Sequence, residues 1–155
     1  MNTRRDVISH SAKIVAMLAS VGLLPSLAQA QPAVYDSAAF EAKNIADLTK
    51  ALGVGAPVES KDVSLTGPDI AENGAVVPVG AATTLTGVKR LLILVEKNPS
   101  VLAAMFDVTD AIEASVSTRV KMGQSSNVYA VAMMNDGKML FARKEVKVTL
   151  GGCGG

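Results

Sequence analysis

Histidine, cysteine and tryptophan are nearly absent from this sequence of 155 residues, which contains one histidine, one cysteine and no tryptophan. The histidine, His10, lies in a leader segment that we expect to be removed, so the remaining chain should contain none. This excludes a self-contained Ser-His-Asp or Cys-His catalytic centre. A zinc site is excluded too, because one cysteine cannot complete it without histidines. A thiol oxidoreductase would ordinarily need a second cysteine. We therefore predict a protein that is not an enzyme and that holds no cofactor or metal.

Aromatic residues and an excess of positive charge are also lacking. The chain has three phenylalanines and two tyrosines, and its 15 basic residues are nearly balanced by 14 acidic ones. None of the aromatic residues is clustered with basic residues, as a stacking platform for nucleic-acid bases would require. The composition therefore predicts no nucleic-acid partner.

The first 30 residues have the organisation of a cleavable export signal. A basic start at Arg4 and Arg5 precedes an apolar stretch from Ile14 to Leu24, and the small-residue sequence Ala28-Gln29-Ala30 follows. The apolar stretch is shorter than the roughly 18 residues of a membrane-spanning helix. We expect cleavage before Gln31, export to a bacterial periplasm and no membrane association afterwards.

The export route is indicated by the sequence around the two arginines. Thr3-Arg4-Arg5-Asp6-Val7-Ile8 resembles a twin-arginine signal, with Lys13 before the apolar stretch. Asp6 and Ser9 depart from that pattern, and an ordinary secretory signal with two arginines is the alternative. Both routes lead to the periplasm, where a lone cysteine has no intramolecular disulfide partner.

The body of the chain predicts one helix followed by a β domain. Phe40, Ile45, Leu48 and Leu52 recur at helical spacing, so residues 37–52 are predicted to form one amphipathic helix. Short valine-rich segments separated by turn residues then predict strands. These segments are Val58–Leu65, Gly74–Val79, Arg90–Lys97, Leu102–Val108, Glu113–Met122, Val128–Met134 and Lys138–Leu150.

Two features of the end of the chain refine this prediction. The Asp-Gly step in Asn135-Asp136-Gly137 suits a tight hairpin between the last two strands. In the final strand Val146, Val148 and Leu150 alternate with charged or polar residues, as in a strand with one buried face. The fold class predicted is all-β: an antiparallel immunoglobulin-like β-sandwich, with the helix at its N-terminal side. The expected divisions are 1–30 (export signal), 31–150 (the helix and the β-sandwich domain) and 151–155 (a flexible arm).

Other candidate sites are weak. Gly53-Val54-Gly55 follows a helix and lacks the third glycine of a dinucleotide-binding loop. Asp107 and Asp110 form a carboxylate pair, but a turn between strands favours the same residues. Basic residues could form a docking patch for an anionic partner, although solvated strand edges explain them more simply. These residues are Lys89, Arg90, Arg119, Lys121, Arg143 and Lys144.

The single cysteine lies at the C-terminus in Gly151-Gly152-Cys153-Gly154-Gly155. Two glycines on each side make a segment that costs much entropy to order, so we expect the thiol to be mobile and exposed. An extended chain spans about 3.3 to 3.6 Å per residue, so Cys153 can hold its sulfur roughly 10 Å beyond the last strand. Such an arm could present sulfur inside the pocket of another protein.

Nothing in the local sequence activates this thiol. An unperturbed cysteine has a pKa of about 8.5, and the residues next to Cys153 include no histidine and no cation. The sulfur should therefore hold cargo rather than process it. A thiol without function, or one that forms an intermolecular disulfide, is the alternative from these residues alone.

The C-terminal sequence Val148-Thr149-Leu150-Gly151-Gly152-Cys153-Gly154-Gly155, together with Ile70 to Val79, resembles the SoxY family of sulfur carriers from bacterial thiosulfate oxidation. The likeness extends over the whole chain, including the leader. It implies an immunoglobulin-like domain that pairs with a SoxZ-type subunit as a heterodimer. It also implies that Cys153 is the covalent attachment site, and that Gly151, Gly152, Gly154 and Gly155 form the arm.

The resemblance implies a sequence of partner enzymes as well. A haem protein would join thiosulfate oxidatively to the thiol, and a hydrolase would release the terminal sulfone as sulfate. A sulfane dehydrogenase or transferase would act on the remaining sulfur.

Three other classes of protein remain open. A structural periplasmic domain would use the tail cysteine for an intermolecular disulfide. A carrier of the ubiquitin type would be activated at the carboxylate of Gly155, with no need for Cys153. A thiol oxidoreductase would need the second cysteine that this chain lacks.

Overall fold

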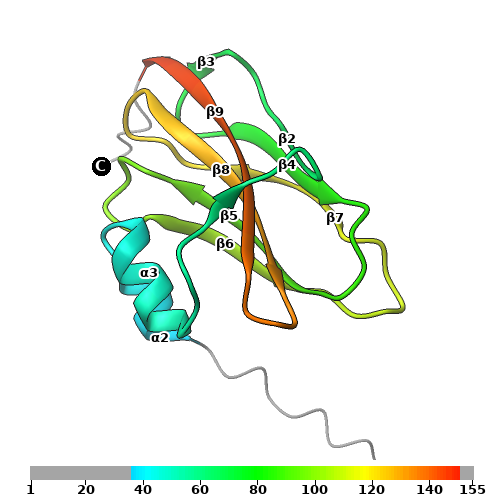
Figure 1. The fold of residues 1–155 in the computed structure, drawn as a ribbon. Coiled ribbons are helices and arrows are strands. Elements are labelled where there is room, and N and C mark those ends of the chain that lie inside the picture. Colours follow the sequence, from blue (N-terminus) through cyan, green and yellow to red (C-terminus); the bar gives the residue numbers. More distant parts are fainter. Residues whose placement is uncertain (1–35, 151–155) are drawn as a thin grey trace, which may run out of the picture. The chain divides into compact units, whose positions relative to one another are not determined.

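Valine-rich strands build two sheets that pack face to face (Figure 1). The computed structural model describes residues 36–150. The larger sheet has the order β1-β9-β8-β5-β6, with β3 also paired to β9, and the smaller sheet has the order β2-β4-β7. The strands are β1 (Val58–Glu59), β2 (Val63–Thr66), β3 (Ile70–Asn73), β4 (Val77–Thr83), β5 (Val88–Val95), β6 (Leu102–Asp107), β7 (Ser115–Val120), β8 (Ser126–Met134) and β9 (Met139–Leu150). The predicted all-β, immunoglobulin-like sandwich is confirmed.

Strand β5 is buried on both of its faces, which explains its nearly continuous apolar sequence. Leu91 and Ile93 point into the core between the sheets, whereas Leu92 and Leu94 point into a second core on the opposite face of the larger sheet. All four side chains are fully buried. Alternation along one strand thus supplies two separate hydrophobic cores.

Two short helices, α2 (Ser37–Glu41) and α3 (Ile45–Leu52), cover that second core (Figure 1). Each helix starts at a side-chain cap: Asp36 accepts a hydrogen bond from the Ala39 amide at 3.1 Å, and Asn44 accepts one from the Asp47 amide at 2.8 Å. Such caps satisfy amides that have no partner within the helix. Gly53, with φ of 66°, ends α3 in the left-handed conformation.

The predicted single helix over residues 37–52 is therefore wrong. Ala42 adopts an extended conformation with ψ of 130°, and its carbonyl accepts a hydrogen bond from the Val101 amide at 3.0 Å. Asn44 then caps a new helix. A tertiary hydrogen bond and a strong cap outweigh the helical periodicity that spans both segments.

The strands after the helices also differ from the sequence prediction. The predicted strand Val58–Leu65 is two strands in different sheets, because Ser60 and Asp62 form a local turn through hydrogen bonds of 3.0 and 3.1 Å. Strand β3 was not predicted. Both β1 and β3 run parallel to β9, so these two pairings depart from the expected antiparallel pattern.

The remainder of the sandwich follows the prediction closely. The hairpin between β8 and β9 turns at Gly137, whose φ is 84°. On β9, Val146 and Val148 face the core between the sheets, as their alternation indicates. Within residues 36–150, neither helix has the length or the apolar character needed to cross a bilayer.

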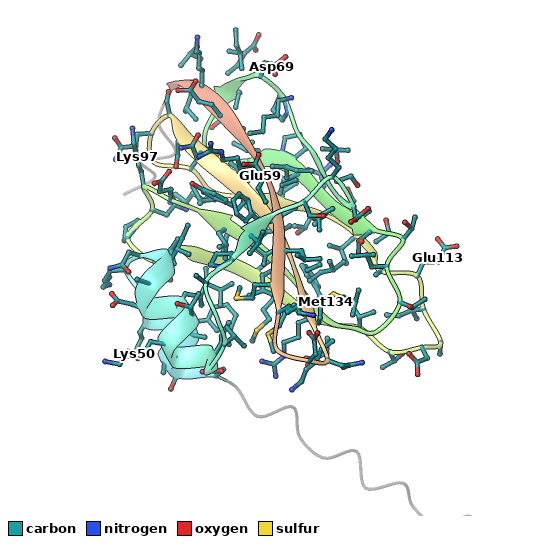
Figure 2. All side chains as sticks on the ribbon, in the orientation of Figure 1. Lys50, Glu59, Asp69, Lys97, Glu113 and Met134 are labelled. Carbon is teal, nitrogen blue, oxygen red and sulfur yellow. The ribbon has the colours of Figure 1, made fainter. Side chains whose placement is uncertain are left out.

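The second core should depend on Leu48, the one residue of α3 that is buried. Replacing it in Leu48→Ala should lower the free energy of unfolding by about 2–5 kcal/mol, because a cavity forms beneath the helix. Urea unfolding measures this change. The control Lys50→Ala, on the exposed face of α3 (Figure 2), should stay within about 0.5 kcal/mol of the parent protein. Equal effects of the two substitutions would show that α3 does not pack as described.

Candidate functional site

Strand β9 leads into the predicted C-terminal arm, and its last residues are held from both sides. Antiparallel pairing with β8 extends from Met133↔Met139 to Ser126↔Val146. Beyond that point the parallel strand β3 supports β9 on its other edge, where Figure 1 shows the two strands side by side. We call residues Lys147–Leu150 the arm root.

The parallel pairing with β3 reaches the last residue of the strand. Its register matches Ile70 with Lys147, Ala71 with Val148 and Asn73 with Leu150. The Lys147 amide donates to the Asp69 carbonyl at 2.9 Å, and the Thr149 hydroxyl donates to the Glu72 carbonyl at 3.0 Å. One edge of the arm root is thereby hydrogen-bonded along its length.

The opposite edge of the arm root is held by a side chain. The amide of Val148 donates a hydrogen bond to Oγ of Ser125 at 2.9 Å. Ser125 directly precedes β8, so its hydroxyl takes the place of the next backbone acceptor after the last β8–β9 pair. Polar backbone groups at a strand end require such partners when the neighbouring strand has ended.

Ser125 lies in the loop between β7 and β8, which is hydrogen-bonded to the loop after β5. Nδ2 of Asn98 donates to the Lys121 carbonyl at 2.7 Å, and the Gly123 amide donates to Oδ1 of Asn98 at 3.4 Å. The Lys97 amide also donates to Oγ of Ser126 at 3.0 Å. The loops after β5 and β7 therefore form one hydrogen-bonded platform behind the arm root.

An ion pair crosses from the loop before β3 to β9. Nζ of Lys144 lies 2.9 Å from Oδ1 of Asp69 and donates to the Gly67 carbonyl at 2.7 Å. The hydrogen bond and the charge of Lys144 hold the pKa of Asp69 below its ordinary value. Figure 2 shows Asp69 at the end of the molecule where β9 finishes. The Asp69 side chain is 87% exposed, so this pair orients the loop and adds little to overall stability.

A pocket among the described residues lies at the other end of the sandwich. It has a volume of about 740 Å³ and lies between the β4–β5 and β6–β7 loops, where Val88, Asp110, Ile112 and Glu113 belong to its lining. Val88 is paired with Met134, at the end of β8 opposite to Ser126. At about 3.3 Å per residue, the length of β8 separates this pocket from the arm root by roughly 25 Å.

The predicted site residues fall into two groups. Cys153 and the glycines Gly151, Gly152, Gly154 and Gly155 lie outside the described residues, so their roles remain predictions. The export signal of residues 1–30 also lies outside them.

The basic residues do not form one patch. Arg90 pairs with Asp107 at 2.7 Å, and Lys144 pairs with Asp69. Arg90 is level with Met133 and Arg143 with Tyr129, four positions apart along β8. The two arginines lie on the strands to either side of β8, so their backbones are roughly 16 Å from each other. Asp107, which forms a candidate carboxylate pair with Asp110 in the sequence, is thus the partner of Arg90. Among residues 36–150, no group of three potential ligands is suited to a metal ion.

Sequence reasoning missed the elements that hold the arm root. Neither Ser125 nor Asn98 belongs to a motif that marks it as a structural anchor. The segment containing β3 was compared with a family but not recognised as a strand. A parallel pairing between residues nearly 80 positions apart has no local signature in the sequence.

Comparisons with known proteins bear on the same part of the chain. The family described as "Sulfur oxidation protein SoxY" matches residues 48–153, a range that ends at the cysteine. The solved structure of the sulfur carrier protein SoxY from Chlorobium limicola f thiosulfatophilum is 36% identical in sequence. The match covers 68% of this chain and 97% of that one, with a TM-score of 0.59.

Other solved structures are more distant in sequence and in structure. A superoxide reductase (neelaredoxin) from Ignicoccus hospitalis is 20% identical, covering 56% of this chain and 79% of its own, with a TM-score of 0.48. Fibronectin(III)-like modules of Clostridium thermocellum CbhA are 18% identical, covering 56% and 93%, with a TM-score of 0.42. No curated protein sequence matches the chain.

The Asp69–Lys144 pair gives a titration that can be measured. Because the folded-state pKa of Asp69 is lowered, the pair contributes stability above the ordinary aspartate pKa of about 3.9 and loses it as the pH falls through the lowered value. NMR titration of the Asp69 carboxyl carbon should give a midpoint below 3.9. In Lys144→Met the midpoint should return to about that value. Identical midpoints in the two proteins would contradict the ion pair.

Proposed function

Since this chain belongs to the SoxY family of sulfur oxidation proteins, we propose that it is a periplasmic carrier that holds thiosulfate-derived sulfur covalently on Cys153. A sulfur-carrier role follows from the family. The attachment site, the compartment and the partner proteins are the proposed part.

The distance between the arm root and the pocket supports attachment at Cys153. The sulfur can reach roughly 10 Å from Leu150, whereas the 740 Å³ pocket lies roughly 25 Å from the arm root. The chain after residue 30 also contains no histidine that could act as a general base. The thiol therefore depends on other proteins for the chemistry that loads and unloads it.

Loading requires an oxidant, which we assign to a haem protein as the family resemblance implies. The thiol and thiosulfate form an S–S bond: Cys–SH + S₂O₃²⁻ → Cys–S–S–SO₃⁻ + H⁺ + 2e⁻. The two electrons pass to the haem partner and the proton is released. Hydrolysis then breaks the bond between the sulfane sulfur and the sulfone. Water supplies an oxygen atom, sulfate leaves, and a persulfide remains on Cys153 for a sulfane dehydrogenase or transferase.

The partners should therefore be of two kinds. A SoxZ-type subunit would form a lasting heterodimer with the sandwich. The haem protein, the hydrolase and the sulfane dehydrogenase would bind transiently, each accepting the same arm. A glycine-flanked thiol suits this sharing, because glycine presents no side chain that could clash in a narrow channel.

Export would place the carrier with these partners. We infer that residues 1–30 direct it to the periplasm, with the twin-arginine route as the expected one, on the basis of Arg4, Arg5 and the apolar stretch. Cleavage would leave Gln31 as the first residue.

The substitution Cys153→Ser should leave the fold intact and abolish thiosulfate-dependent electron release, because serine cannot form the disulfide-type bond to the sulfane sulfur. The measurement uses the complete set of partner enzymes with the mature carrier. Circular dichroism and the melting temperature should match those of the parent protein. Parent-like turnover by Cys153→Ser would exclude the carrier role of this residue.

A second substitution tests whether loading and unloading require that the positions beside Cys153 carry no side chain. Gly152→Val should slow loading or unloading by roughly 5-fold or more, the effect of about 1 kcal/mol of steric overpacking, while the melting temperature changes little. Gly154→Val tests the other side of the thiol. Rates that are unchanged with every partner enzyme would show that the absence of side chains beside Cys153 is irrelevant.

A further inference from the structure

We propose that Ser125 is a positioning residue for the carrier arm, because its hydroxyl fixes the point at which β9 ends and the arm begins. This inference rests on the proposed attachment of sulfur to Cys153. It concerns the side chain that anchors the arm root and leaves the chemistry at the thiol unchanged.

The hydrogen bond from Val148 to Ser125 lies where the backbone pairing of β8 with β9 ends. Antiparallel pairing with β8 ends at Ser126↔Val146, so the next amide that points to that edge, from Val148, has no β8 carbonyl opposite it. Oγ of Ser125 accepts from this amide at 2.9 Å. Val148 is half-buried and packs on the core between the sheets, which makes loss of the hydrogen bond costly.

The other edge of the arm root is held largely by main-chain pairing with β3, which no side-chain substitution removes. Thr149 adds one side-chain contact there, from its hydroxyl to the Glu72 carbonyl at 3.0 Å. Ser125 and Thr149 are thus the two side chains whose hydroxyls hold the arm root. Only Ser125 secures the edge that lacks a neighbouring strand.

Ser125 can serve as an anchor because its loop is fixed in turn. Asn98 links the loop to the segment after β5 through the Lys121 carbonyl and the Gly123 amide. Because this loop is held in place, it does not move with Val148. A displacement of Val148 therefore breaks its hydrogen bond to Ser125.

The position of the arm root determines how long the free segment is. Release of residues 148–150 would lengthen the predicted tether to Cys153 from residues 151–153 to residues 148–153. The effective concentration of a tethered group falls as about the −3/2 power of tether length, so complete release should lower delivery of Cys153 to a docked enzyme about 3-fold. A less defined starting point also reduces the fraction of arms that enter a channel correctly.

The experiment compares Ser125→Ala with Ser125→Thr, which retains a hydroxyl. Hydrogen exchange of the Val148 amide in Ser125→Ala should be about 5-fold faster, the factor equivalent to about 1 kcal/mol at 298 K, and Ser125→Thr should restore protection. Ser64→Ala is the matched control, because it removes a hydroxyl bonded to the Ala82 carbonyl in the smaller sheet. Exchange that is independent of low denaturant concentrations identifies local opening rather than unfolding.

The functional measurement uses the same variants with the enzyme that loads thiosulfate. In Ser125→Ala, kcat should fall by up to about 3-fold, the value for complete release of residues 148–150, with KM unchanged. The thiol should react with a small disulfide reagent at the parent rate. The double variant Ser125→Ala/Thr149→Val should show a larger fall in kcat. If the fall in kcat came from general destabilisation, the melting temperature would fall too, and Ser64→Ala would show a similar loss of kcat.

Unchanged exchange at Val148, or unchanged kcat in the double variant, would overturn the role of Ser125. If Cys153→Ser is inactive in the same assay, the carrier function stands and the positioning role alone fails. If Cys153→Ser is active, the proposed function fails before the role of Ser125 arises.

Discussion

The structure depends on the pairing of β9 with two different neighbours along its length. Strand β8 supports it from Met139 to Val146, and the parallel strand β3 continues that support to Leu150. Without β3, the last four residues of β9 would have only Ser125 as a partner on the described part of the chain. The boundary between an ordered strand and the glycine-rich terminus is therefore set by a strand whose backbone lies nearly 80 residues earlier. In the proposed function, that boundary is the place at which the arm with Cys153 begins.

The two hydrophobic cores give this boundary its stability. Strand β5 separates them, and the same sheet packs on β2-β4-β7 on one face and on α2 and α3 on the other. Val146 and Val148 extend the core between the sheets toward the arm root. The connection between α2 and α3 is joined to the segment after β5, because the Val101 amide donates a hydrogen bond to the Ala42 carbonyl at 3.0 Å. The second core thus supports the loop platform behind the arm root, and the core between the sheets supports the arm root itself.

Sequence periodicity and turn residues sufficed for the sandwich, for the β8–β9 hairpin and for the shared buried face of Val146 and Val148 on β9. These features depend on residues that are close together in the sequence, so the alternation of residue types and the turn residues predict them. They did not suffice for the break at Ala42, which a hydrogen bond from Val101 stabilises, or for β3, whose pairing with β9 is long-range. Ser125 and Asn98 could not be singled out because serine and asparagine are common in loops, and only the fold shows which backbone groups they satisfy. Cys153 was identifiable because it is the sole thiol and has glycines on both sides.

The central claim is that cargo is bound to the sulfur of Cys153, and mass spectrometry of the C-terminal peptide from protein purified out of the periplasm tests it most directly. The account predicts a set of added masses, of sulfur and sulfonate groups, that localise to Cys153 and disappear after treatment with a reductant. Cargo on the carboxylate of Gly155, or a peptide found only as a disulfide-linked dimer, would contradict it.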